Sequence, residues 1–421
     1  MKFHQATTGI AFLSLLCGSI AFAQSSQQSA PVAVLVQGTL VESGSPPFHL
    51  KAQIAEERDA PGTFIEIHWL EPDRWRRTIQ SAEFSQTIVM NGNKVFEQDS
   101  QMYMPPEIAT LLAAMTDPRQ IIAALQPGDI VWTKANGISQ ESGAICLSPG
   151  RMCLGTALGL MESVGAQGHR LDFTDYQKFH EKRIARRLTH TISVGDFYTA
   201  QITELEDLKS EDYGLFTVAE PTPPQKRLRV EILGEEELRS LATEAPDIVW
   251  PQVLDGTVTG NSSFSVSLDT EGKVRDVQVL ESANERSNDS AIRQIMRWKF
   301  KPATRDGFPV QAEGTLNFDV NTRAAGPKDV LSDAEARKLA SNIVEPVVPA
   351  GSVPPGAVYK IWIAVDADGF VIEKIVYQAP HGVDFGTVDQ ALRQWQFKPL
   401  MMNGKPQPYR ALLELHLQTS P

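Results

Sequence analysis

The sequence RWKFKP at residues 297–302 returns as QWQFKP at residues 394–399, an offset of 97 positions. The same offset relates Gly272 to Gly369. A constant offset with no net insertion indicates two copies of one small domain. We therefore expect a tandem repeat in the second half of the chain.

The first copy predicts strands and a helix in a fixed order. Its helix is indicated by Ala291, Ile295 and Trp298, which share one face at helical spacing. Strands are indicated where apolar and polar residues alternate and one face is therefore buried. The predicted elements are a leading helix at 235–242, strands at 264–268, 274–279 and 314–320, and a second helix at 289–298.

The second copy repeats this order. Ser332 and Glu335 have the spacing of a capping box, which predicts a helix from there to about Ser341. The later elements follow in the same sequence as in the first copy. They are strands at 359–365, 371–377 and 411–417 and a helix at 388–395.

The repeated motif residues are interpreted as core and turn. In the first copy, Trp298 and Phe300 are expected to pin the helix to the sheet. Gly272 would permit a tight turn between strands, and Pro302 would stop the helix from resuming. Their counterparts in the second copy are Gly369, Trp395, Phe397 and Pro399.

Residues 31–234 predict a large antiparallel sheet with a small helical insert. Every second residue from Phe48 to Ile54 is apolar, as in a strand with one buried face. Asn91-Gly92 between two apolar runs indicates a hairpin. Residues 105–115 and 118–125 each predict a short helix with proline near its start. Further strands are predicted at 65–69, 170–173, 184–188, 197–202, 215–218 and 228–232.

Residues 1–23 have the features of a cleavable secretory signal peptide. Lys2 precedes a mostly apolar stretch from Gly9 to Ala21, and Ala21-Phe22-Ala23 is a small-x-small cleavage site. The chain has a net charge of −12 and a pI of about 5.2. We therefore exclude nucleic acid and anionic membrane surfaces as partners.

Two cysteines remain after such a cleavage, Cys146 and Cys153. They flank Pro149-Gly150 symmetrically, and a hairpin there would set them opposite each other, near disulfide distance. An even cysteine count in an exported protein favours pairing. We expect a Cys146–Cys153 disulfide with a structural role.

The repeat resembles the C-terminal domain of TonB, the periplasmic energy transducer of Gram-negative bacteria. The shared pattern is a strand, Asp-x-x-Gly-x-Val, a second strand, a helix, then Trp-x-Phe-x-Pro and Gly-x-Pro before the last strand. It covers residues 245–320 and 345–418. The resemblance implies a two-layer α/β unit with a three-stranded antiparallel sheet. It also implies a partner peptide that adds as a strand to an exposed sheet edge.

The closing strand of each copy is the edge that we expect to bind such a peptide. The partners implied are segments of outer-membrane receptors or of other periplasmic proteins. The candidate partner-binding residues are Thr315, Asn317, Asp319, Leu412, Glu414 and His416.

The chain departs from TonB in its N-terminal part. TonB has an uncleaved membrane anchor and a long proline-rich spacer, whereas this sequence has a cleavable signal and a β-rich domain. Energy transduction is therefore not implied, and we expect a periplasmic protein. An uncleaved signal would instead anchor it in the inner membrane.

The β-rich domain resembles the periplasmic lipoprotein carriers of the LolA/LppX type. This resemblance rests on the successive strands from Phe48, the sequence WLEPDRWRR at residues 69–77, the Asn91-Gly92 hairpin and the short helices after Tyr103. The resemblance implies a curved antiparallel sheet closed by helices around an apolar cavity, with a lipid or a lipoprotein as ligand. A sheet domain with an ordinary filled core remains the alternative.

Catalytic motifs are missing from the sequence. It has no Gly-x-Ser-x-Gly, His-Glu-x-x-His, phosphate loop or dinucleotide fingerprint, so we expect no enzymatic activity, no cofactor and no metal. His49 and His68 lie on predicted strands and are interpreted as ordinary histidines. The segment Asp366–Gly369 is interpreted as a hairpin turn, because a calcium loop of the EF-hand type needs flanking helices.

The sequence thus predicts an α+β protein with a curved antiparallel sheet domain followed by two small TonB-like domains. Two functions remain open. The first is binding of partner peptides by strand addition, in outer-membrane transport. The second is carriage or sensing of a lipid or lipoprotein by the β domain. The predicted parts are a signal peptide (1–23), a LolA-like domain (31–234), two TonB-like domains (235–322 and 343–421) and a linker with a short helix (323–342).

Overall fold

The computed structural model describes residues 39–56, 62–120, 144–147, 152–155, 160–166, 169–192, 196–323 and 330–419. The predicted signal peptide lies outside these residues. The chain forms two compact units. One contains the described residues up to Ala242 together with Ser265–Leu280 and Phe300–Thr315, and the other contains Thr243–Phe264, Glu281–Lys299 and the described residues from Leu316. The domain boundaries expected from the sequence stay predictions.

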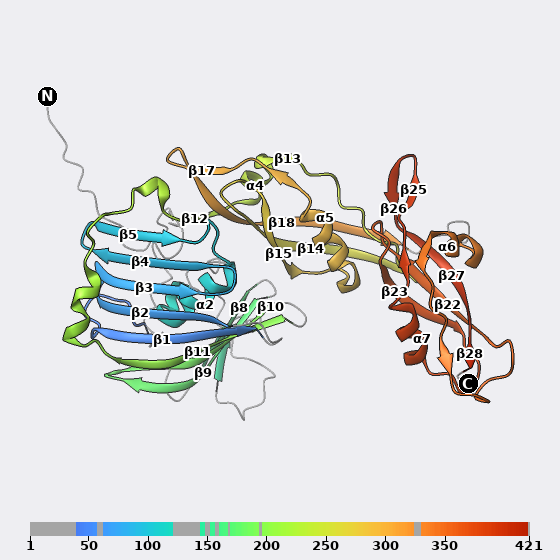
Figure 1. Ribbon diagram of the computed structural model, residues 1–421, viewed down its shortest axis with the longest axis horizontal. Helices are drawn as coiled ribbons and strands as arrows, with labels where there is room; N and C mark the ends of the chain where they lie inside the picture. The colour runs from blue at the N-terminus through green and yellow to red at the C-terminus, as the bar shows by residue number, and fades with distance from the viewer. Residues whose placement is uncertain are drawn as a thin grey trace. The chain divides into compact units, whose positions relative to one another are not determined.

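The N-terminal part is an eleven-stranded sheet in the order β5-β4-β3-β2-β1-β11-β10-β9-β8-β7-β6 (Figure 1). Each pairing between neighbouring strands is antiparallel. The predicted curved antiparallel sheet is therefore present. Its strands are β1 (Phe48–Glu56), β2 (Thr63–Glu71), β3 (Arg74–Gln80), β4 (Ser85–Asn91), β5 (Lys94–Asp99), β6 (Ala144–Leu147), β7 (Met152–Gly155), β8 (Leu160–Ala166), β9 (His169–Phe179), β10 (Lys182–Ile192) and β11 (Asp196–Asp207).

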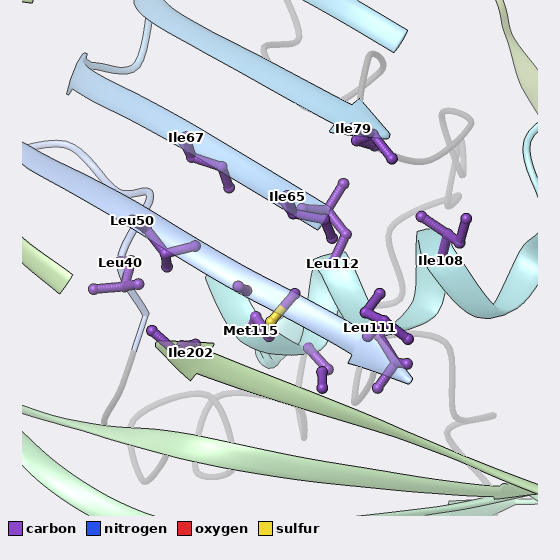
Figure 2. Packing of buried hydrophobic residues seen from close by; sticks show 14 of the residues in the cluster. Leu40, Leu50, Ile65, Ile67, Ile79, Ile108, Leu111, Leu112, Met115 and Ile202 are labelled. Atoms are coloured by element: carbon purple, nitrogen blue, oxygen red, sulfur yellow. The ribbon is translucent and has the colours of Figure 1, made fainter. Parts of the chain in front are cut away.

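Alternation along the strands gives this sheet one apolar face. Helix α2 (Pro106–Thr116) packs on that face, and its Ile108, Leu111, Leu112 and Met115 are buried among strand residues. Figure 2 shows these helix side chains lying toward the strand residues Leu50, Ile65, Ile67, Ile79 and Ile202, with Leu40 beside them. The helix predicted at 105–115 is confirmed, whereas most of the one predicted at 118–125 lies outside the described residues.

The hairpin predicted at Asn91-Gly92 is confirmed, with the turn one residue further along. Asn91 pairs with Lys94, which leaves Gly92 and Asn93 as the two-residue loop. Gly92 has φ +60°, a value that glycine adopts without strain.

A second sheet, in the order β12-β18-β14-β15, contains the first copy of the repeat. Its strands are β12 (Val230–Leu233), β14 (Thr257–Leu268), β15 (Val274–Glu281) and β18 (Phe308–Arg323), with β17 (Ala303–Arg305) also on β18. Helices α4 (Glu235–Leu241) and α5 (Asn288–Ile295) belong to the same copy.

Two predictions for this region are wrong. Residues 228–232 were assigned to the N-terminal sheet, but β12 runs parallel to β18, with Val230 opposite Gln311. Residues 215–218 were predicted as a strand, but Leu215 and Phe216 end the 3₁₀ segment η2 (Ser210–Phe216). Short apolar runs do not by themselves reveal their partner strand or even their helical or extended form.

A third sheet, in the order β19-β27-β22-β23, contains the residues that the sequence predicts as the second copy, and its strand order corresponds to that of the second sheet. Here too a short strand runs parallel to the last one, with Leu331 opposite Ala411. The elements are β19 (Val330–Leu331), α6 (Asp333–Leu339), β22 (Val358–Val365), β23 (Val371–Gln378), α7 (Phe385–Leu392) and β27 (Tyr409–His416).

Four short strand pairs complete the fold: β13 (Ala242–Glu244) with β16 (Lys299–Phe300), β20 (Ala340–Asn342) with β24 (Gln396–Phe397), β21 (Val347–Val348) with β28 (Gln418–Thr419), and β25 (Leu400–Met402) with β26 (Lys405–Gln407). Among the described residues, no helix has the length and apolar character needed to cross a membrane.

Candidate functional site

The repeated glycine and the repeated Trp-x-Phe segment touch each other in both copies. Gly272 has φ +81° and Gly369 has φ +95°. A Cβ atom at Gly272 would lie 2.5 Å from the carbonyl oxygen of Phe300, and one at Gly369 would lie 2.1 Å from that of Phe397. Both positions therefore need glycine for its backbone conformation and for its missing side chain.

The aspartate of each motif organises the turn before the glycine. Asp366 Oδ1 accepts hydrogen bonds from the backbone N–H groups of Asp368 and Phe370, both at 2.9 Å. Asp269 does the same for Glu271 and Lys273. Since β22 and β23 pair on either side of Asp366–Gly369, the hairpin interpretation of this segment is confirmed.

The motif aromatics lie in the interior of each copy. Trp298, Phe300, Trp395 and Phe397 are all buried. The indole N–H of Trp395 donates to the carbonyl oxygen of Val344 at 2.8 Å. The backbone N–H of the residue before each motif proline donates a hydrogen bond of 2.8 Å to a carbonyl oxygen of the leading helix. Lys301 donates to Leu241, and Lys398 donates to Leu339. These residues hold the domain together and do not form a surface site.

The predicted partner edge on β27 is already bonded to side chains of its own repeat. The N–H of Glu414 donates to Asp333 Oδ1 at 3.0 Å, and its carbonyl accepts from Arg337 at 2.6 Å. The N–H of His416 donates to Glu345 Oε2 at 2.9 Å. A peptide could add to this edge only by displacing those side chains.

Leu412, Glu414 and His416 project on the sheet face opposite the core. Leu412 stands opposite Trp362 in the register, and Glu414 stands opposite Lys360, to which it forms an ion pair of 2.5 Å. On β18 of the first copy, the predicted residues Thr315, Asn317 and Asp319 alternate with the core residues Leu316 and Val320. Asn317 accepts a hydrogen bond of 2.6 Å from Ser263.

The open edge of the second copy is β23, at the end of its sheet. In the first half of β23, the side chain of Glu373 contacts other segments of the chain. It accepts a hydrogen bond from the N–H of Leu254 and forms an ion pair of 2.5 Å with Arg286. The second half of β23 is exposed and apolar. The exposed fractions are 40% for Ile375, 40% for Val376 and 62% for Tyr377.

An aromatic patch adjoins this open half-strand. Ile375 stands opposite Trp362, whose ring lies 6.1 Å from that of Tyr377 in an edge-on arrangement. Leu412 flanks Trp362 from the other side. The sequence analysis expected the partner edge on the closing strands and did not single out residues 375–377; the predicted partner-binding residues stay a prediction.

The apolar face of the N-terminal sheet ends in a buried polar cluster. Arg77 donates to Gln86 Oε1 at 2.5 Å, and Gln86 Nε2 donates to Asp99 at 2.7 Å. Burial raises the pKa of Glu97 to about 8, with the neighbouring Asp99 adding to the shift. Burial also raises the pKa of Asp99.

A cavity of about 50 Å³ lies between α2 and the sheet. Its lining is mostly apolar, with Trp69, Trp75 and Leu112 in the wall beside Arg77 and Asp117. This volume suits a few water molecules and falls well short of the roughly 300 Å³ of a small-ligand pocket.

Three metal-binding side chains meet on the opposite face of this sheet. The ligand atoms of His49, Glu66 and His68 all lie within 4.8 Å of one another. The sequence analysis interpreted His49 and His68 as ordinary histidines and did not foresee this cluster, because the pairing register of β1 and β2 brings them together.

Cys146 and Cys153 stand directly opposite each other in the register of β6 and β7. The structure does not describe the side chains of these two cysteines, so the disulfide stays a prediction.

Comparison with known proteins supports part of the sequence interpretation. Residues 254–320 match the family model of the Gram-negative bacterial TonB protein C-terminal domain. The matched residues fall in the first copy, and family membership of the second copy stays a prediction. A solved structure of a LolA superfamily protein from Nitrosomonas europaea aligns at 9% identity with a TM-score of 0.27, over 45% of this chain and 98% of that one. No curated protein matches the chain.

Proposed function

We propose that this chain is a periplasmic interaction protein that binds an extended segment of a partner protein by strand addition to the second half of β23. The observation that carries the proposal is the exposed apolar edge at Ile375, Val376 and Tyr377. Edge strands offer unpaired backbone groups, and proteins normally block them. Strand addition uses those groups for affinity and nearby side-chain pockets for selectivity.

The contrast between β23 and the part of β27 beyond its pairing with β19 supports β23 as the binding edge. Asp333, Arg337 and Glu345 bond to the backbone of β27, which protects that edge from other chains. The side chains of the second half of β23 are exposed. An unprotected apolar edge in a protein that protects its other edge fits a functional surface.

The aromatic patch supports selectivity for apolar partner residues. Every second residue of an added strand would lie over the same face as Ile375, Trp362 and Leu412. The counterparts of Trp362 and Leu412 in the first copy are Ser265 and Thr315, which are polar. We therefore assign peptide binding to the second copy, with the first copy as its structural support.

Carriage of a lipid by the N-terminal domain is less well supported. Leu111, Leu112 and Met115 of α2 occupy the apolar face of the sheet. A bound acyl chain would have to displace this helix, whereas a peptide on β23 requires no rearrangement of the core.

Binding can be tested with peptides selected from a phage-displayed library on the full-length protein. Synthetic forms of the selected peptides would then be titrated by calorimetry. We expect bound peptide to slow hydrogen exchange of the amides at 375–378. Methylation of alternate peptide nitrogens should abolish binding, because strand addition depends on backbone hydrogen bonds.

Tyr377→Lys is expected to weaken peptide binding about tenfold or more, roughly 1.4 kcal/mol, because a lysine on an edge discourages pairing. Met402→Lys is the matched control, since Met402 is similarly exposed and lies on β25 of the same copy. Equal affinities of both variants, or exchange protection at a segment other than 375–378, would remove β23 as the site.

A further inference from the structure

A row of titratable side chains crosses the N-terminal sheet on the face that α2 does not cover. Glu206 of β11 stands opposite His49 of β1, and His49 stands opposite His68 of β2. Glu66 lies two residues before His68 on the same strand, so it projects on the same face. Three neighbouring strands thus contribute two imidazoles and two carboxylates to one place.

The distances within this row are short. The rings of His49 and His68 stack with centroids 4.2 Å apart and planes 12° apart. His49 Nε2 lies 2.8 Å from Glu66 Oε1, and His49 Nδ1 lies 3.5 Å from Glu206 Oε1. His49 therefore has a carboxylate at each of its two nitrogens.

Either an imidazole hydrogen or a metal ion can occupy the space between His49 Nε2 and Glu66 Oε1. If the Nδ1–H group of His49 faces Glu206, the lone pair of Nε2 faces a carboxylate oxygen at hydrogen-bond distance. Two lone pairs repel at that distance unless a proton or a metal ion lies between them. A carboxylate on the far nitrogen is also the usual partner of a metal-ligating histidine.

His68 is held in place beside His49. Only 7% of the residue is exposed, and its ring stacks on that of His49. The imidazole nitrogens of histidine are common ligands of metal ions in proteins.

The two lysines near the site are each paired with a carboxylate. Lys51 pairs with Glu204 at 2.8 Å, and Lys209 lies 3.4 Å from Glu206.

We propose that His49, Glu66 and His68 bind one divalent transition-metal ion, with Glu206 orienting His49. Two imidazoles and one carboxylate suit zinc best, with water in the fourth position. Tetrahedral zinc places ligand atoms about 3.4 Å apart, and the three ligand atoms already lie within 4.8 Å of one another. Binding must turn the two imidazole rings out of their stack, so that a nitrogen lone pair of each points at the ion, which then ties β1 to β2.

The test uses the full-length protein after removal of metals with a chelator. Titration with zinc chloride by calorimetry should show one site per chain with a dissociation constant in the micromolar range or tighter. Cobalt chloride should give visible absorption bands of tetrahedral Co²⁺. Magnesium chloride should not bind, because imidazole ligands disfavour it.

Substitution of single residues tests which side chains bind the zinc ion. Glu66→Gln and His68→Gln should each weaken zinc binding about 100-fold, and Glu206→Gln about tenfold, as for an orienting partner. Glu66→Gln is the more informative ligand variant, because glutamine can still bond to His49 and the fold is kept. His180→Gln is the matched control, since His180 also pairs with a carboxylate, Asp207, at 2.5 Å.

The proposal stands if zinc affinity falls in the Glu66 and His68 variants and is unchanged in the His180 variant. A chain that binds no zinc at 100 μM would overturn it, as would equal affinity in the Glu66→Gln and wild-type proteins. If His68→Gln alone unfolds the protein, the Glu66→Gln titration decides.

Discussion

At the scale of single residues, Gly369 shows why the repeat motif needs its glycine. Gly369→Ala combines a left-handed backbone with a Cβ atom 2.1 Å from the Phe397 carbonyl oxygen. We expect a loss of about 3 kcal/mol in the free energy of unfolding, measured by urea titration with tryptophan fluorescence. Gly356→Ala is the control, because Gly356 has φ +78° with no atom within 4 Å of a new Cβ. The Gly356→Ala variant should lose only about 1 kcal/mol in the free energy of unfolding. Equal losses in the two variants would show that the close approach of a Cβ atom to the Phe397 carbonyl oxygen does not destabilise the protein.

Glu97 predicts a pH dependence of stability. Its folded-state pKa is raised from 4.5 to about 8, so between these values the folded state holds a proton that the unfolded state has released. Stability should therefore fall as pH rises through this window. Glu97→Gln should remove that fall, because the amide stays neutral and can still accept the bond of 2.9 Å from the N–H of Leu228.

The measurement is the melting temperature of the wild type and of Glu97→Gln between pH 5 and pH 8. Glu83→Gln serves as the control, since Glu83 is exposed. A pH dependence that is the same in the wild type and in Glu97→Gln would contradict the assignment.

At the scale of elements, helix α6 protects the edge of β27 through Arg337. The guanidinium lies 2.8 Å from Asp333, 2.9 Å from Glu345 and 5.2 Å from the ring centre of Trp395. Arg337→Leu would leave two carboxylates and the Glu414 carbonyl without this donor. We expect a loss of about 3 kcal/mol in the free energy of unfolding.

Exposure of the β27 edge should also promote self-association of the Arg337→Leu protein, detectable by light scattering. Arg337→Lys keeps the charge but not the planar fork, so it should fall between the wild type and the leucine variant. An Arg337→Leu protein as stable and as monomeric as the wild type would contradict a protective role of α6.

At the scale of the whole molecule, the second compact unit joins parts of both repeats through arginines of α5 and of the residues just after it. Arg293 forms an ion pair with Asp366, which is fully buried, and its guanidinium lies 4.1 Å from the ring centre of Phe370. Arg297 pairs with Asp368 at 2.8 Å on a more exposed surface. The hairpin turn of the second copy is therefore held by side chains from the first.

Removal of these two arginines should have unequal effects. Arg293→Met leaves a buried carboxylate without its cation and should cost about 3 kcal/mol in the free energy of unfolding. Arg297→Met removes an exposed pair and should cost less than about 1 kcal/mol. Thermal unfolding of both variants distinguishes them, and similar losses would argue against a buried role for Arg293.

The sequence by itself determined several of the elements. Alternation of apolar residues located β1 and β2, and the Ser332–Glu335 spacing located the start of α6. The shared offset predicts two copies of one unit, and the second copy stays a prediction. These are local or periodic signals, which a chain carries whatever its tertiary partners are.

Only the tertiary structure decided which strands pair, and both candidate sites depend on that pairing. The exposed edge at Ile375–Tyr377 is a consequence of β23 ending its sheet, while β27 is protected by side chains from α6. The cluster of His49, Glu66 and His68 exists because the register of β1 and β2 places two histidines opposite each other. A turn signal such as Asn91-Gly92 sets the pairing of two neighbouring strands, but the order of strands that are distant in the sequence follows from packing between distant segments.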